Sequence, residues 1–176
     1  MSTLISPPPA GTLSEYYESY RHYILENDIY KGLIAQGEMT YQFLKSLTEE
    51  QGNFKYASDK WSVKEVIGHL IDCERIFCYR ALAIMRGDKS PLPGMDENAY
   101  AANANYHSRT LRDIADEYYT VRQSTLHLAG NPDATALDNV GIANQKEVTP
   151  RALFYFMLVH ERHHTGVIRK KYLGQS

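Results

Sequence analysis

Residues 62–87 read SVKEVIGHLIDCERIFCYRALAIMRG, and this stretch decides the fold. It opens with Ser62 and has Glu65 three residues later, the spacing of a capping box, in which each side chain bonds the other residue's backbone amide. Apolar residues then recur with the 3.6-residue period of a helix: Val63, Val66, Ile67, Leu70, Ile71, Phe77, Cys78, Ala81 and Leu82. The pattern ends near Gly87. It predicts one long helix whose apolar stripe packs against other helices.

The helical period continues on both sides of this stretch. A short tyrosine-rich helix is expected from Leu13 to about Leu25. Longer helices are expected over residues 28–47, 108–129 and 149–171. Thr149 and Pro150 favour the start of the last one, because threonine caps a helix and proline suits its first position. The long connections cover residues 88–107, with a short helix from Asp96, and residues 131–148; neither shows the alternation of a strand.

Four long amphipathic helices predict an all-α fold, a four-helix bundle with long crossover loops. We expect the bundle domain to cover residues 13–173. An extended lead-in is expected over residues 1–12, because Pro7, Pro8 and Pro9 favour an extended chain. A chain of 176 residues is long enough to form one such core.

The composition restricts the partners and the compartment. The net charge is -2, which argues against a nucleic-acid partner. The longest apolar run, residues 152–159, is too short to cross a membrane, and the first residues do not read as a secretory signal. Cys73 and Cys78 point about 140° apart on one helix, so no disulfide between them is expected. We therefore expect a cytoplasmic protein that acts on a small molecule, without a nucleic acid or a membrane.

Residues 160–164 read HERHH and match the H-E-x-x-H signature of zinc proteases. Such proteases take their third metal ligand downstream of the motif. The twelve residues after His164 contain no histidine, cysteine, aspartate or glutamate. The extended form of the motif would need Gly at position 167 and His at 170, where this chain has Val167 and Lys170. The protease interpretation therefore fails, and the match reduces to a pair of histidines with Glu161 between them.

His160 and His164 lie one helical turn apart inside an apolar stripe. The ring nitrogens of two neutral imidazoles on such a face need partners, and helix carbonyls are already hydrogen-bonded. A divalent metal would take one nitrogen from each ring. A pair of hydrogen-bonded core histidines is the alternative. A third ligand must then come from upstream, and His69, on the flank of its helix's stripe, is the best candidate. Cys73, one turn from His69, is a lesser one. The histidines near helix ends are expected in solvent: His22, His107 and His127.

Other polar residues near these positions have expected roles as well. Asp72, Glu161 and His163 are candidates for supporting the ligands from outside the coordination sphere. Glu74 lies near the centre of its helix's apolar stripe, and Arg122 lies on the apolar face of the third long helix, so an ion pair between them is expected. A di-iron site would need a second Glu-x-x-His motif, which the sequence does not contain.

Three segments carry a resemblance to a known family: KWSVKEVIGHLIDCERIF (60–77), MDENAY (95–100) and HERHHTGVIRKKYL (160–173). They resemble the DinB-like superfamily of metal-binding four-helix proteins, which includes bacillithiol S-transferases. The resemblance implies that His69, His160 and His164 bind one divalent ion, nickel or zinc, and that the protein is a homodimer. The chain departs from the family pattern at Val167, where glutamine often follows the glycine.

The resemblance implies a metal-dependent thiol S-transferase, in which a low-molecular-weight thiol is activated by the metal and attacks an electrophile. A metal-dependent hydrolase and a non-catalytic, stress-associated metal-binding module are the alternatives. Three histidines suit zinc, nickel, copper and iron alike, so the residues themselves do not select the ion. No catalytic residue beyond the metal ligands is assigned from the sequence.

Overall fold

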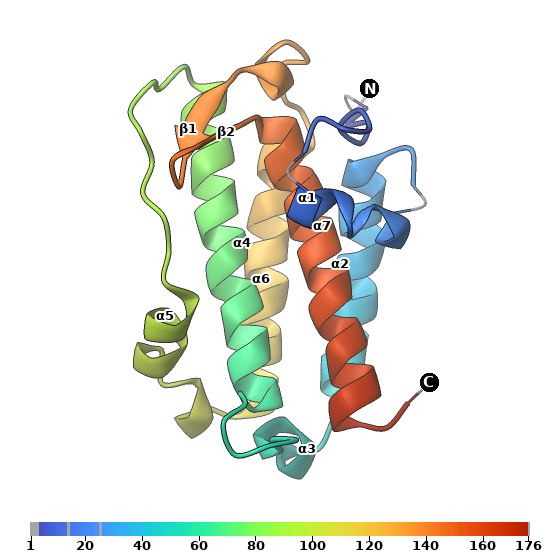
Figure 1. Cartoon of the computed structure of the whole chain (residues 1–176). Helices are drawn as coiled ribbons and strands as arrows, with labels where there is room; N and C mark the ends of the chain where they lie inside the picture. Colours follow the sequence, from blue (N-terminus) through green and yellow to red (C-terminus); the bar gives the residue numbers. More distant parts are fainter. Residues whose placement is uncertain (1–3, 14, 25, 176) are drawn as a thin grey trace.

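Four long helices form the body of the protein in a computed structural model that describes residues 4–13, 15–24 and 26–175 (Figure 1). They are α2 (Ile29–Lys45), α4 (Val63–Met85), α6 (Leu111–Ala129) and α7 (Pro150–Val167). Each packs against two others: α4 against α7 and α6, and α2 against α6 and α7. Helices α2 and α7 run in one direction and α4 and α6 in the other. The all-α four-helix bundle is confirmed.

The capping interactions expected at the starts of the helices form in the structure. Ser62 and Glu65 make both hydrogen bonds of the capping box at the start of α4. Thr149 Oγ1 accepts from the Ala152 amide at the start of α7, where Pro150 is the first helical residue. Helix α6 begins at Leu111 rather than near position 108, because Thr110 provides its cap and residues 106–108 form a separate 3-10 turn, η2.

The two long connections differ in their course. Residues 86–110 run back along the whole bundle, so that α4 and α6 are parallel, and they contain α5 (Glu97–Asn103), which Asp96 caps as expected. Residues 130–149 stay at one end and contain the 3-10 turn η3 (Ala136–Asp138). They also form a hairpin of β1 (Gly141–Ala143) and β2 (Lys146–Val148). These strands are too short to show alternation in the sequence.

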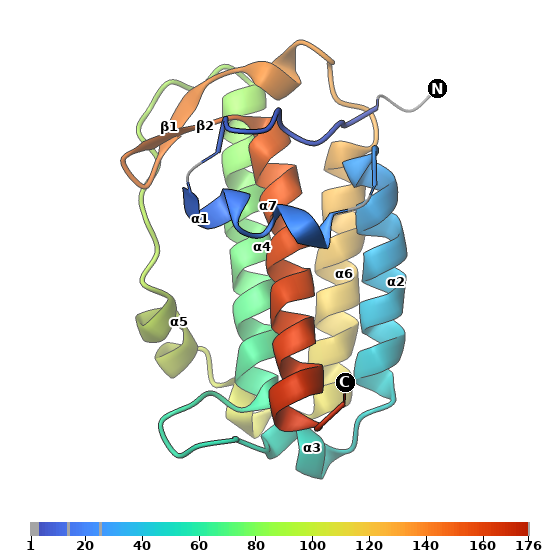
Figure 2. The ribbon, with the colours of Figure 1, turned by 45° about the vertical axis from the view of Figure 1, so that its right-hand side comes forward.

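The N-terminal region is less helical than expected. It has only a short helix, α1 (Glu15–Glu18), and a 3-10 turn, η1 (Arg21–Tyr23); the expected end at Leu25 lies outside the described residues. Arg21 donates to the carbonyls of Pro8 and Pro9 as well as to Glu18, and these bonds tie the segment to the residues before it. Figure 2 shows the segment crossing the bundle over α7.

Short elements complete the ends of the bundle. Helix α3 (Glu49–Asn53) follows α2, and α7 continues into a π-helical turn, η4 (Ile168–Tyr172), close to the expected end at position 171. Ile5 in the lead-in is fully buried, and its carbonyl accepts from the Ile29 amide. No helix in the described ranges is both long and apolar enough to span a membrane.

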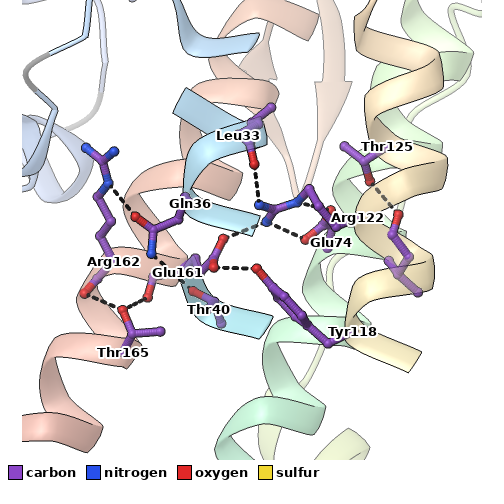
Figure 3. A network of polar contacts seen from close by, with 11 residues as sticks. Leu33, Gln36, Thr40, Glu74, Tyr118, Arg122, Thr125, Glu161, Arg162 and Thr165 are labelled. Atoms are coloured by element: carbon purple, nitrogen blue, oxygen red, sulfur yellow. Dashed lines mark hydrogen bonds and ion pairs between the residues drawn. The ribbon is translucent and has the colours of Figure 1, made fainter. Parts of the chain in front are cut away.

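A polar network lies in the core, where all four long helices meet (Figure 3). Arg122 on α6 is 1% exposed and donates to both carboxylate oxygens of Glu74 on α4, at 2.8 Å each, which confirms the expected ion pair. It also donates to Glu161 on α7, at 2.6 Å, and to the Leu33 carbonyl on α2, at 3.0 Å. Gly37 is needed beside it, because a Cβ there would lie 2.7 Å from Arg122 Cγ.

We predict that Arg122→Met destabilises the protein strongly, because it removes the guanidinium and leaves two carboxylates buried without a counter-charge. Breaking a buried ion pair in this way costs about 3–5 kcal/mol. Urea denaturation followed by circular dichroism would measure the loss. Lys60→Met is the control, since the ion pair of Lys60 with Asp59 is exposed and the variant should unfold like the wild type. A loss for Arg122→Met no larger than that of the control would contradict the prediction.

Candidate metal centre

Three histidines from two neighbouring helices converge on one point. His69 comes from α4, and His160 and His164 come from α7, one turn apart. One nitrogen from each ring can be chosen so that all three lie within 4.8 Å of one another. The Nε2 atoms of His69 and His160 are 3.1 Å apart, and the three ring centroids are 4.6–5.1 Å apart. The structure therefore brings together the three residues that the sequence singles out.

The donor set fits a divalent transition metal. Nitrogens bound to one ion at about 2.0–2.1 Å lie roughly 3–3.5 Å from each other, and the 3.1 Å between His69 and His160 falls in that range. Imidazole suits nickel, zinc, copper and iron. Among the described residues, the group contains three histidines and no fourth ligand. A site with three protein ligands leaves positions for water or a substrate, as catalytic zinc sites do.

Burial keeps the three imidazoles neutral. It lowers the pKa of His69, and it lowers that of His160 well below the usual value, with a further contribution from the other histidines. Burial and the proximity of His69 lower the pKa of His164 to about 3. Neutral imidazole is the form that binds a metal, so the lowered pKa values favour the form of the cluster that has free lone pairs.

Aromatic side chains and a thiol surround the cluster. The Trp61 ring lies 5.0 Å from the His69 ring, and the Phe77 ring lies 6.3 Å from that of His160. Cys73 Sγ is 3.7 Å from both ring nitrogens of His69, and burial raises the pKa of its thiol to about 12. Trp61 and Phe77 were not identified as site residues from the sequence. Their positions beside the capping box and on the stripe of α4 were the only signals, and these are equally typical of core residues.

The three candidates for supporting residues are differently placed. Asp72 accepts a hydrogen bond from the Tyr106 hydroxyl, on the side of α4 that faces η2. Glu161 is 2% exposed and is bonded to Arg122 and to the Tyr118 hydroxyl, inside the core network. The His163 ring packs against the rings of His164, Tyr20 and Tyr23. Of the three, only His163 touches a histidine of the cluster in the contacts of the described residues. The histidines expected in solvent are exposed: His22, His107 and His127.

The comparisons with known proteins agree with this architecture. The family model of the DinB superfamily matches residues 33–168. YfiT from Bacillus subtilis, described as a probable metal-dependent hydrolase with an unusual four-helix bundle topology, has a TM-score of 0.73 at 16% identity over 97% of this chain and 95% of its own. The DinB-like protein YjoA from Bacillus subtilis has a TM-score of 0.59 at 19% identity, over 84% and 92%. No curated protein matches the chain.

The buried histidines predict a loss of stability in acid for the metal-free protein. The folded-state pKa of His164 is about 3, below the unfolded value of about 6.5, so between these values only the unfolded chain takes up the proton. Stability is therefore complete above pH 6.5 and declines as the pH falls toward 3. His164 should contribute a decline of about 1–2 kcal/mol between pH 7 and pH 5.

Urea denaturation with a chelator present, at pH 7 and at pH 5, would measure this decline. His164→Gln should lose less stability than the wild type over that interval. His127→Gln, which removes an exposed histidine, should show the full wild-type decline. Equal declines in the wild type and His164→Gln would contradict the assignment.

Proposed function

The chain belongs to the DinB superfamily, and from this premise we propose that it is a metal-dependent enzyme that transfers a low-molecular-weight thiol to an electrophilic small molecule. His69, His160 and His164 would hold one divalent ion, nickel or zinc. The convergence of their nitrogens, the neutral state of their rings and the lack of a fourth ligand in the described group support this assignment. When bound, the ion would lower the pKa of a thiol or water at its open position.

The placement of Glu161 favours a thiol over water as the nucleophile. In proteases with H-E-x-x-H, the glutamate is the general base that takes a proton from water. Here both of its oxygens are engaged, Oε1 by the Tyr118 hydroxyl and Oε2 by Arg122, within the core. A thiol needs less help, because its usual pKa is near 8.5 and a coordinating thiol is deprotonated outright. The commitment of Glu161 to the core is the observation that carries the proposal.

The remaining residues would shape the reaction without taking part in bond changes. In the transfer, a carbon–sulfur bond forms, the bond from that carbon to its leaving group breaks, and the thiol proton passes to solvent. The rings of Trp61 and Phe77 would limit the access of water to two sides of the histidines. The Cys73 thiol lies beside His69, at 3.7 Å from its ring nitrogens, and is not part of the group of three converging ligands.

Hydrolysis is the second candidate. It is favoured by the similarity to YfiT, which is described as a probable metal-dependent hydrolase. The same three histidines would serve it, with water in the place of the thiol. The exposed carboxylate of Glu97 would be an alternative base, since its charge acts on His69. The two candidates therefore differ in the nucleophile and share the metal.

The metal assignment predicts a sharp difference between neighbouring histidines. His69→Ala, His160→Ala and His164→Ala should each lose stoichiometric nickel or zinc, because each removes one of three ligands. His163→Ala and His127→Ala should keep it. Metal analysis of protein purified without a chelator would measure this.

The thermal midpoint provides a second measurement of metal binding. Adding metal at about 100 times its dissociation constant should stabilise the wild type by about 2.7 kcal/mol, and the ligand variants by far less. Stoichiometric metal in His69→Ala, or its loss in His163→Ala but not in His164→Ala, would refute the ligand set.

The choice of nucleophile predicts the dependence of turnover on a thiol. Metal-loaded protein should consume an aryl chloride only when a small thiol is present, and the product should contain the thiol sulfur, as shown by mass spectrometry. His160→Ala should abolish this turnover. Turnover of ester or amide substrates without a thiol would establish the hydrolase instead. Metal binding without turnover of either kind would leave a non-catalytic metal-binding module.

A further inference from the structure

A cavity of about 530 Å³ lies between the N-terminal segment, α4, the hairpin and the start of α7. Its volume falls in the usual range of small-molecule sites, about 300–1,000 Å³. Much of its lining is apolar, including Leu13, Tyr17, Phe77, Val148 and Phe156. Arg80 on α4 lines it as well.

Arg80 is buried without an opposite charge. It is 8% exposed, and its Nη2 donates to the Pro93 carbonyl at 2.6 Å. No carboxylate among the described residues lies within ion-pair distance of it. The other buried cations in the described part of the chain are paired: Lys64 with Glu49, at 2.7 Å, and Arg122 with two glutamates. Buried arginines are rarely left unpaired, because removing a guanidinium from water is costly unless an anion replaces the lost hydration.

Two aromatic residues that line the cavity, Phe77 and Phe156, lie near His160. The Arg80 guanidinium carbon is 6.0 Å from the centre of the Phe77 ring, and that ring is 6.3 Å from the ring of His160. Tyr17 stacks on Phe156 at 3.6 Å, and Phe156 precedes His160 by one turn of α7. Phe77 and Phe156 thus connect the lining of the cavity to His160. A ligand held by Arg80 would reach the candidate metal centre past these two rings.

The geometry of the Arg80 guanidinium favours one kind of anion. Guanidinium is planar and presents a fork of N–H donors that matches a carboxylate with two parallel hydrogen bonds. The apolar walls would cover a hydrocarbon or aromatic body. We propose that this cavity binds a small carboxylic acid with an apolar body, that its carboxylate pairs with Arg80, and that acids of this kind whose apolar body carries a leaving group such as chloride are the electrophilic substrates of the enzyme. Only the last part of this inference rests on the proposed function.

The test measures binding to the metal-free full chain by titration calorimetry. The probes are benzoate, phenylbutyrate and decanoate, each paired with its neutral amide of the same shape. At least one acid should bind about ten- to a hundredfold more tightly than its amide, the range expected for hydrogen bonds to a charged group. Arg80→Met, which keeps an apolar side chain of similar length, should remove this preference. Arg80→Lys, which keeps the charge without the fork, should retain part of it.

Arg112→Met is the matched control. Arg112 is an exposed arginine at the start of α6 and does not line the cavity. Its loss should leave the preference for the acid nearly unchanged. Circular dichroism would establish that each variant is folded. If Arg80→Met does not fold, the comparison of the wild type with Arg80→Lys is the test. Equal binding of every acid and its amide by the wild type, or a preference that survives in Arg80→Met, would overturn the site.

The outcomes separate this site from the proposed function. A preference for acids that depends on Arg80 in protein without thiol-dependent turnover would support the cavity and refute the transferase. Thiol-dependent turnover that is equally fast with acidic and neutral aryl chlorides, in both wild type and Arg80→Met, would support the transferase and overturn the substrate assignment.

Discussion

The bundle depends on the Arg122 guanidinium, because it is bonded to all the other long helices. It meets carboxylates from α4 and α7 and a carbonyl from α2, while its own backbone belongs to α6. Buried charges of this kind are costly unless every partner is satisfied, so the network fixes the relative positions of its helices more strictly than apolar packing does. The position of Glu74 on α4 and that of Glu161 on α7 are therefore set relative to each other.

The same two helices carry the candidate metal centre. His69 lies five residues before Glu74 on α4, and His160 directly precedes Glu161 on α7. Because Arg122 bonds both glutamates, it fixes α4 and α7 in a position where the Nε2 atoms of His69 and His160 are 3.1 Å apart. The histidines and the glutamate of the H-E-x-x-H motif thus have different roles. Its histidines face α4, and its glutamate holds the core together, which is why the resemblance to a protease motif does not extend to the chemistry.

Much of this arrangement could be predicted from the sequence, because it follows from local rules. The capping box at Ser62, the helical periods and the i, i+4 histidines each involve residues that are close in the chain. The Glu74–Arg122 pair was predictable because a charge on an apolar stripe requires a partner. The bond of Arg122 to Glu161 was not, because Glu161 was expected on the flank of its stripe and its burial depends on how all four long helices assemble. The hairpin was missed because its strands are too short to show alternation. The broken N-terminal helix was missed because contacts distant in sequence, such as that of Tyr17 with Phe156, hold the segment.

Contacts distant in sequence also hold the N-terminal segment over the cavity that Arg80 lines. The segment has little regular structure, yet Tyr17 stacks on Phe156 and Arg21 bonds its own preceding prolines. It forms one wall of the cavity that Arg80 lines, and α4, α7 and the connection with the hairpin form the rest. Local unfolding is cheapest where backbone hydrogen bonds are few. The cavity therefore combines residues of two long helices, Arg80 among them, with a segment that has few backbone hydrogen bonds and opens locally at a lower cost.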